Sequence, residues 1–282
     1  MIDKPPGLTS RGVVDRARGW FPRRARLGHT GTLDPLATGV LVLCVGHATR
    51  LAEYVQAMPK TYRACFCLGA TSDSDDADGT ITPVAAALVP SLEQLQAALQ
   101  GFLGEIEQTP PAYSAAKVGG RRAYALAREG AEVDLEPRRV HVYQIDIRSY
   151  TYPHLDLLDE CGRGTYIRSL ARDLGAQLGC GAYVQALRRT CVGHFDEQAA
   201  ISLDADTATA RGKLLPVKEA VARLPALTLD DQLLVRLRQG QRVPFQDAME
   251  GEVAIFDHRG ALAAVARIDG HGVLHPEKVL QG

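Results

Sequence analysis

Apolar positions along the chain follow strand-like spacing in some segments and helix-like spacing in others. Apolar or alternating runs of strand length occur at 40–45, 61–68, 140–147 and 155–158. Helical spacing predicts helices at 47–58, 121–129 and 166–178, and another that begins at Ser91. Ser91 and Gln94 have the spacing of a capping box, which marks this start. Because these segments are interspersed without a regular βαβ period, the sequence predicts an α+β fold. We expect a mixed, largely antiparallel sheet with flanking helices.

The pattern changes near Leu224 and Pro225. The remaining residues contain one segment with helical spacing, 231–239, and short strand-like runs such as 253–256 and 262–268 that glycines separate. We therefore predict two domains, a large one at 1–223 and a small β-rich one at 224–282.

Composition limits the kinds of partner. Hydrophobic residues make up 46% of the 282 residues, and 32 Lys and Arg nearly balance 33 Asp and Glu. A protein that coats nucleic acid through bulk charge is normally basic, so any RNA surface must come from local clusters of charge. The chain has no run of about 18 apolar residues, and its six cysteines form no C-x-x-C pair. We expect a cytoplasmic protein with reduced thiols and no membrane span.

Basic residues are clustered near the start of the chain. Residues 11–26 contain six arginines, including Arg23 and Arg24, and a single acid, Asp15. A solvated helix face normally mixes both signs of charge, so we interpret this cluster as a surface for the RNA backbone. The pair Arg121 and Arg122 is a second candidate for phosphate contacts. An ordinary solvated surface is the alternative for both.

The segment at 28–39, GHTGTLDPLATG, has the composition of a shaped loop, because its glycines and proline disfavour a regular helix. Pro35 restricts Asp34 to an extended conformation, and the glycines allow another molecule to approach the backbone closely. A stiff loop of this kind can hold a reactive carboxylate. A structural Asx-type turn explains the same residues, so both interpretations stay open here.

Several other chemistries fail the spacing tests. No lysine follows these glycines as a phosphate-binding loop requires, and the dinucleotide-binding fingerprint G-x-G-x-x-G is absent. The acidic run at 73–78 lacks the glycine and the final glutamate of a calcium-binding EF-hand loop. The H-x-E and P-C-x-x-C pattern of zinc base deaminases is also missing. We therefore expect no metal and no cofactor.

The loop motif resembles the signature of the bacterial tRNA pseudouridine-55 synthases, the TruB family. Further motifs in the same order support the resemblance along nearly the whole chain: DKPPGLTS, KTYRACFCLG, PPAYSAAKVGGRRAYALAREG, GTYIRSLARDLG and LRRT. The resemblance implies a pseudouridine-synthase fold followed by a small RNA-binding domain of the PUA type. It also implies an enzyme that isomerises the uridine at position 55, in the T loop of tRNA, as a monomer without an obligate protein partner.

The resemblance assigns roles to individual residues. Asp34 matches the catalytic aspartate, Arg168 the arginine that pairs with it, and Tyr62 the tyrosine that packs on the target base. The residues implied to contact or accommodate the substrate are His29, which fills the space left by the flipped uridine, Asp76, Tyr166, Leu187 and Lys4. Each also has an ordinary structural interpretation, and their shared order in the family motifs is what favours the functional one.

Pseudouridine formation cleaves the glycosidic bond, turns the base and joins C5 to the ribose C1′. An ionised aspartate serves this reaction as nucleophile or as base, and both roles stay open. The uridine must first leave its stack, which costs a few kcal/mol. Stacking on Tyr62, worth about 1–3 kcal/mol, offsets that cost. Two alternative functions remain: a non-catalytic RNA-folding protein on the same scaffold, and a synthase that acts on another RNA such as rRNA.

Overall fold

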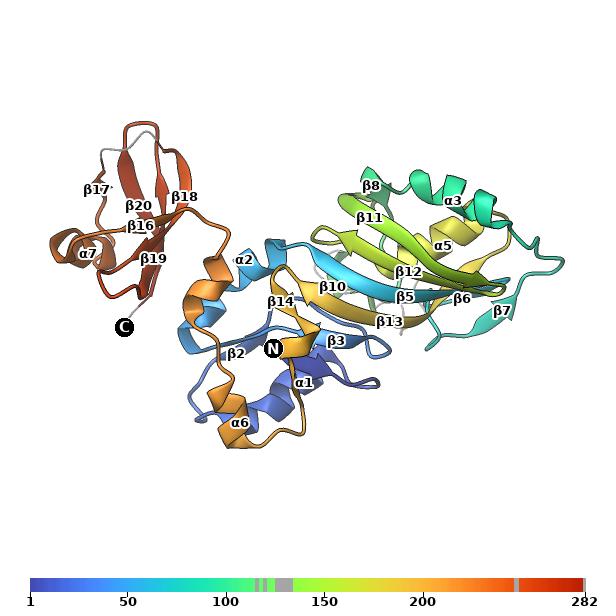
Figure 1. The fold of residues 1–282 in the computed structure, drawn as a ribbon, viewed down its shortest axis with the longest axis horizontal. Coiled ribbons are helices and arrows are strands. Elements are labelled where there is room, and N and C mark those ends of the chain that lie inside the picture. Colours follow the sequence, from blue (N-terminus) through green and yellow to red (C-terminus); the bar gives the residue numbers. More distant parts are fainter. Residues whose placement is uncertain (115–116, 119–120, 125–133, 246–248, 281–282) are drawn as a thin grey trace. The chain divides into compact units, whose positions relative to one another are not determined.

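The computed structural model describes residues 1–114, 117–118, 121–124, 134–245 and 249–280 (Figure 1). The chain divides into two compact units. The first consists of Met1–Val13, Thr32–Val42 and Ala57–Leu203, and the second of Val14–Gly31, Leu43–Gln56 and Asp204–Gly282. The second unit thus collects segments from three parts of the chain. The domain boundary between 223 and 224 stays a prediction.

Within the described residues, the first unit is built on a nine-stranded sheet with the order β15-β1-β3-β13-β5-β12-β11-β8, in which β14 also pairs with β13. The strands are β1 (Ile2–Lys4), β3 (Thr38–Leu41), β5 (Lys60–Leu68), β8 (Gly104–Gln108), β11 (Arg138–Thr151), β12 (His154–Cys161), β13 (Ala182–Val192), β14 (Phe195–Asp196) and β15 (Ile201–Ser202). Two neighbouring pairs, β1 with β15 and β13 with β3, are parallel and the others are antiparallel. The predicted fold class is confirmed.

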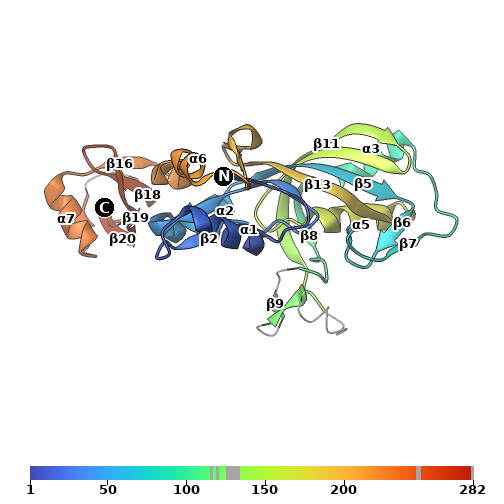
Figure 2. The same cartoon turned by 90° about the horizontal axis from the view of Figure 1, so that it is seen from below.

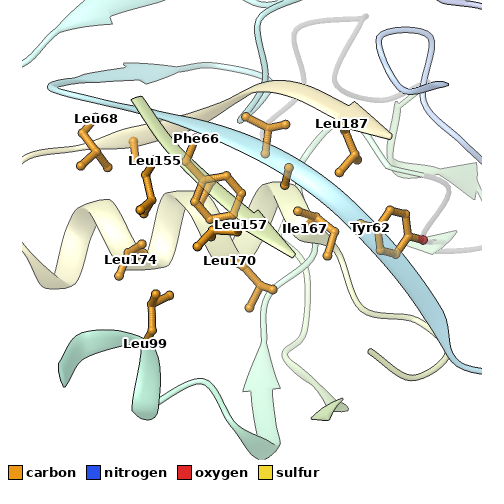
Figure 3. Packing of buried hydrophobic residues seen from close by; sticks show 14 of the residues in the cluster. Tyr62, Phe66, Leu68, Leu99, Leu155, Leu157, Ile167, Leu170, Leu174 and Leu187 are labelled. Atoms are coloured by element: carbon orange, nitrogen blue, oxygen red, sulfur yellow. The ribbon is translucent and has the colours of Figure 1, made fainter. Parts of the chain in front are cut away.

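Two helices, α3 (Leu92–Gln100) and α5 (Ile167–Gln177), pack against the central strands of this sheet (Figure 1). The predicted capping box is present, because Ser91 and Gln94 each bond the other's backbone N–H. Leu170 and Leu174 of α5 and Leu99 of α3 meet Phe66 and Leu157 of the sheet in one core (Figure 3). Burial of these apolar side chains is what fixes α5 on the sheet.

Two features of the sheet differ from the sequence prediction. The run 40–45, predicted as one strand, is divided between β3 and β4 (Leu43–Val45), which belong to different sheets. The long strand β13 was not predicted, since two register shifts against β5 interrupt its period-two pattern.

Short paired strands complete the first unit: β6 (Ala70–Ser72) with β7 (Ile81–Pro83), and β9 (Lys117–Val118) with β10 (Arg121–Arg122). Figure 2 shows β9 standing away from the nine-stranded sheet. The helix predicted at 121–129 is wrong at its start, because Arg121 and Arg122 form a strand. Its residues 125–129 lie outside the described part of the chain.

The second unit contains a five-stranded sheet with the order β16-β18-β19-β20-β17. These strands are β16 (Ala226–Thr228), β17 (Val243–Pro244), β18 (Gly251–Phe256), β19 (Leu262–Ile268) and β20 (Val273–Val279), and α7 (Asp231–Arg238) packs on them. A β-rich C-terminal part is therefore confirmed, including its predicted helix. No helix among the described residues is long and apolar enough to cross a membrane.

Shorter elements make up the rest of the second unit. They are η1 (Arg18–Trp20), β2 (Leu27–His29), which pairs with β4, η2 (Gly46–Leu51), α6 (Thr207–Gly212) and η4 (Val217–Val221). Two helices, α1 (Ser10–Ala17) and α2 (Ala52–Ala57), extend across the boundaries of the two units. The helix predicted at 47–58 is thus a 3₁₀ segment followed by a short α-helix.

Asp159 is an unusual residue in the core of the first unit. It lies on β12 directly opposite Tyr62 of β5, its exposed fraction is 0%, and neither carboxylate oxygen has a hydrogen-bond partner among the described residues. Burial raises the pKa of Asp159 to about 7, and the nearby Asp146 acts in the same direction. The folded protein therefore holds the proton of Asp159 more tightly than the unfolded chain does. Stability should fall as the pH rises from the ordinary aspartate pKa towards 7, and the deficit persists above it.

We expect Asp159→Asn to stabilise the protein at alkaline pH, because it keeps the shape of the side chain and removes the charge. The raised pKa corresponds to about 4 kcal/mol near pH 8, and the buried Asn amide, which also lacks partners, offsets about half of it. The expected gain is therefore about 2 kcal/mol, or roughly 4–8 °C in Tm. The gain should shrink as the pH is lowered towards about 5. Thermal unfolding across this range checks the prediction, with Glu160→Gln on the same strand as control. A gain that does not change with pH contradicts it.

Candidate active site

Asp34 and Arg168 form an ion pair between the loop that precedes β3 and the first turn of α5. Their Oδ2 and Nη2 atoms are 2.9 Å apart, and the Arg168 side chain is 5% exposed whereas that of Asp34 is 33% exposed. The guanidinium also donates to the carbonyl oxygens of Ser74 and Tyr113, each at 2.9 Å. These contacts fix the Arg168 guanidinium against the Asp34 carboxylate, which is exposed enough for a substrate to reach.

Asp76 is the second carboxylate at this cation. Its Oδ2 lies 3.4 Å from Nη1 of Arg168, and its Oδ1 accepts hydrogen bonds from the Ser74 hydroxyl at 2.6 Å and the Asp78 N–H at 3.1 Å. The backbone beside Asp76 is anchored to β13, because the Ala77 N–H donates to the Val184 carbonyl at 2.9 Å. The acidic loop thus supplies a buried acceptor for Arg168.

Lys4 supports the Asp34 loop through hydrogen bonds to its backbone. Its side chain is fully buried, and Nζ donates to the carbonyl oxygens of Pro35 at 3.1 Å and Ala37 at 2.7 Å, as well as to Pro5 at 2.9 Å. These bonds join the backbone on the C-terminal side of Asp34 to the first strand. Lys4 therefore contacts the backbone of the loop that carries Asp34.

Ser10 holds the other side of Asp34, and sequence reasoning did not single it out. Its hydroxyl accepts from the Leu33 N–H at 2.7 Å and donates to the Leu33 carbonyl at 2.9 Å. Both groups are buried. The residue stands at the end of the DKPPGLTS motif, which was the available signal, but nothing local in that motif indicates a contact with Leu33.

Charge and burial act against each other at Asp34. Burial raises the pKa of the Asp34 carboxyl above its ordinary value, Arg168 lowers it, Asp76 raises it and Lys4 lowers it. Although protein atoms crowd the carboxyl, a third of the side chain remains exposed, so solvent and Arg168 together favour the ionised form. Burial also lowers the pKa of Lys4 to about 8, an effect that Asp34 opposes.

Tyr62 and Leu187 lie on the adjacent strands β5 and β13. In the register of these strands Leu187 is opposite Ala64 and Arg189 is opposite Tyr62. Figure 3 shows Tyr62 at the end of the row of core side chains, with its hydroxyl directed away from them. Burial raises the pKa of the Tyr62 hydroxyl, Arg189 lowers it, and the negative charge of Asp34 raises it.

The remaining predicted residues lie as follows. Tyr166 is half-buried at the N-terminus of α5, two positions before Arg168. His29 is half-buried on β2 of the second unit. Arg23 and Arg24 are exposed in a turn of the same unit, which the Ala25 N–H closes on the Pro22 carbonyl at 2.8 Å. Arg121 and Arg122 form β10.

Comparison with known proteins identifies the kind of protein that has this fold and site. Family models match residues 20–167 (TruB family pseudouridylate synthase, N-terminal domain), 168–221 (tRNA pseudouridylate synthase B C-terminal domain) and 225–280 (pseudouridine synthase II TruB, C-terminal). A tRNA pseudouridine synthase B of Xanthomonas campestris is 45% identical over 100% of this chain and 93% of its own length. One from Dehalococcoides mccartyi is 43% identical over 99% of this chain and 94% of its own.

A solved structure agrees with these matches. A chain in the crystal structure of a Cbf5-Nop10-Gar1 complex superposes with a TM-score of 0.75 and is 26% identical, covering 99% of this chain and 83% of that one. The fold and the sequence relatives together define the class, which is that of the pseudouridine synthases. More narrowly, the chain belongs to the TruB family and is an enzyme that isomerises uridine to pseudouridine in tRNA.

We predict that Arg168→Met shifts the acidic limb of the pH–rate profile to higher pH. Arg168 lowers the pKa of Asp34, so its loss raises that pKa and the ionised carboxylate then requires more alkaline solution. The rate at the optimum should also fall about 100-fold, because the carboxylate loses its fixed partner. Single-turnover pseudouridine formation measured from about pH 5 to pH 9 checks both effects.

The matched control is Arg139→Met, which removes an exposed arginine that pairs with Glu105 on the outer strands. This variant should keep the wild-type profile. A profile that is unchanged in Arg168→Met would show that the ion pair does not control the ionisation of Asp34.

Proposed function

We propose that the enzyme modifies the uridine at position 55, in the T loop of tRNA, with Asp34 as its catalytic carboxylate. The observation that carries this proposal is the 2.9 Å ion pair with Arg168, which supports an ionised carboxylate at a partly exposed position. Asp34 acts as the nucleophile or as the base during cleavage of the glycosidic bond. Either role requires the negative charge that Arg168 stabilises.

The target base needs a surface once it leaves the stack. Tyr62 and Tyr166 would contact it, Leu187 would line the pocket and Asp76 would complete the polar side. His29 would occupy the position that the uridine vacates. For Lys4 we propose an indirect role, since its three hydrogen bonds end on the backbone around Asp34.

Binding of tRNA would rest on local basic groups, since the net charge of the chain is −1. Arg23 and Arg24 are exposed and form no ion pair among the described residues, so both can meet phosphate. Arg121 and Arg122 are the second candidate. We propose that the β-rich domain at 224–282 adds contacts to tRNA rather than chemistry.

The reaction is an isomerisation that needs neither a redox partner nor a group donor. We therefore propose that the enzyme works without a cofactor, as a monomer without an obligate protein partner. We further propose that this activity is cytoplasmic, because its substrate is tRNA. Gel filtration with light scattering, and an assay with purified protein and unmodified tRNA, test these points. A requirement for a second protein, or a stable oligomer, would count against them.

The decisive test of the proposed function is Asp34→Asn, which removes the charge while keeping the shape of the side chain. Turnover should fall below detection, while the affinity for tRNA changes by less than about threefold, because uniform binding is retained. Asp173→Asn, at a carboxylate on α5 that pairs with Arg172, is the control and should be fully active. Mapping of the modified nucleotide in tRNA and rRNA tests the position. Near wild-type turnover in Asp34→Asn, or modification only elsewhere, would refute the proposal.

We also predict that replacing Arg23 and Arg24 with Ala reduces the salt dependence of tRNA binding. Each phosphate contact contributes a slope of about −0.7 to −0.9 in log K against log salt. Loss of two contacts should therefore make the slope less steep by roughly 1.4–1.8. Affinity should fall alike for all tRNAs. Arg16→Ala is the matched control, because Arg16 belongs to the same cluster but pairs with Asp204. An unchanged slope in the double variant would place the phosphate contacts elsewhere.

A further inference from the structure

Gln108, the last residue of β8, is almost fully buried although its side chain is polar. Its exposed fraction is 2%, and its carboxamide makes two hydrogen bonds to one residue that lies 58 positions further along the chain. The side-chain Oε1 accepts from the Tyr166 N–H at 2.8 Å, and Nε2 donates to the Tyr166 carbonyl at 3.0 Å. An amide that satisfies both groups of a peptide in this way fixes its position and its orientation.

The next residue strengthens the same junction. The Thr109 carbonyl accepts from the Ser169 hydroxyl at 2.8 Å and from Nη2 of Arg172 at 2.9 Å. The end of β8 is therefore joined to the first turns of α5 by four hydrogen bonds, two of them from Gln108. Tyr166, the N-cap residue, makes no side-chain cap of its own. The start of α5 is therefore set by β8.

Two residues assigned to the site project from this junction. Tyr166 itself is bonded to Gln108, and Arg168 follows two positions later with its guanidinium 2.9 Å from Asp34. Successive residues of an α-helix are turned by about 100°, so a small rotation of the first turn carries the guanidinium away from the carboxylate. The bonds of Gln108 oppose such a rotation.

We propose that Gln108 is a positioning residue for the isomerisation, acting through the Tyr166 backbone to hold Tyr166 at the base and Arg168 on Asp34. This inference rests on the roles proposed above for Asp34 and Arg168. In this proposal the Gln108 amide touches neither the substrate nor the Asp34 carboxylate, yet it influences the ionisation of Asp34 by positioning Arg168.

The test compares wild type with Gln108→Met, which keeps the length of the side chain and removes both hydrogen bonds. Displacement of Tyr166 and Arg168 by a fraction of an ångström should lower the single-turnover rate about 10- to 100-fold. Affinity for tRNA should change by less than about threefold, because the phosphate contacts are elsewhere. The acidic limb of the pH–rate profile should move to higher pH, since Arg168 no longer lowers the pKa of Asp34 as strongly.

Gln108→Asn makes a smaller change at the same contacts. Its carboxamide still accepts and donates but is one methylene shorter, so both hydrogen bonds to Tyr166 weaken and the rate should lie between those of wild type and Gln108→Met. This variant also keeps the test decisive if Gln108→Met is poorly folded, because the shift in the pH profile can be read from either one. Gln144→Met is the control: this exposed glutamine on β11 bonds only to Asp146 and should behave as wild type.

The outcomes distinguish this inference from the proposed function. A wild-type rate and pH profile in folded Gln108→Met, beside an inactive Asp34→Asn, would overturn the inference alone. Turnover by Asp34→Asn would overturn the proposed function and the inference with it. A lower rate that comes with reduced thermal stability and an unshifted pH profile would show that Gln108 serves the fold only, which also overturns the inference.

Discussion

The guanidinium of Arg168 joins parts of the chain that are far apart in sequence. It contacts Asp34 from the loop before β3, Asp76 and the Ser74 carbonyl from the acidic loop, and the Tyr113 carbonyl from the segment after β8. Removing a cation from water is costly, and only several well-placed acceptors compensate that cost. Because the Arg168 side chain is only 5% exposed, the three segments are constrained to meet where it lies. The position of the Asp34 carboxylate therefore depends on this buried cation.

Within the Asp34 loop, the Ala37 N–H closes a turn on the Asp34 carbonyl at 3.1 Å. The N-terminal segment supplies further bonds to this loop. Lys4 donates to the Pro35 and Ala37 carbonyls, and Ser10 bonds both backbone groups of Leu33. The backbone around Asp34 is thereby fixed on both sides, while a third of the Asp34 side chain remains exposed. Such rigid support for a reacting group is what a reaction that depends on alignment requires.

The arrangement also explains how one sheet serves two purposes. The central strands β5 and β13 bury the core residues that pack α5, and the same cluster includes Tyr62, Leu187 and Leu33, the residue before Asp34. Helix α5 in turn carries Arg168, so packing in the core and alignment in the site are coupled. Asp159, a buried carboxyl opposite Tyr62, is the exception within this apolar face, and its raised pKa expresses the cost of placing it there.

The sequence alone predicted the local secondary structure and identified the candidate residues of the site. The capping box at Ser91, the strand at 61–68 and the β-rich C-terminal part follow from residue spacing, and Asp34, Tyr62 and Arg168 follow from motifs in a fixed order. These signals lie within a few residues of one another, so they can be read without knowing the fold.

Only the tertiary structure decided which distant groups meet. The division of 40–45 between two sheets, the bulged strand β13, the bonds of Ser10 to Leu33 and the clamp of Gln108 on Tyr166 all depend on register and packing between separate elements. Nothing in the residues around Gln108 indicates that its partner, Tyr166, lies 58 positions further along the chain. Such contacts arise from how the apolar faces of strands and helices bury one another, and periodicity along the chain identifies the faces but not their pairing.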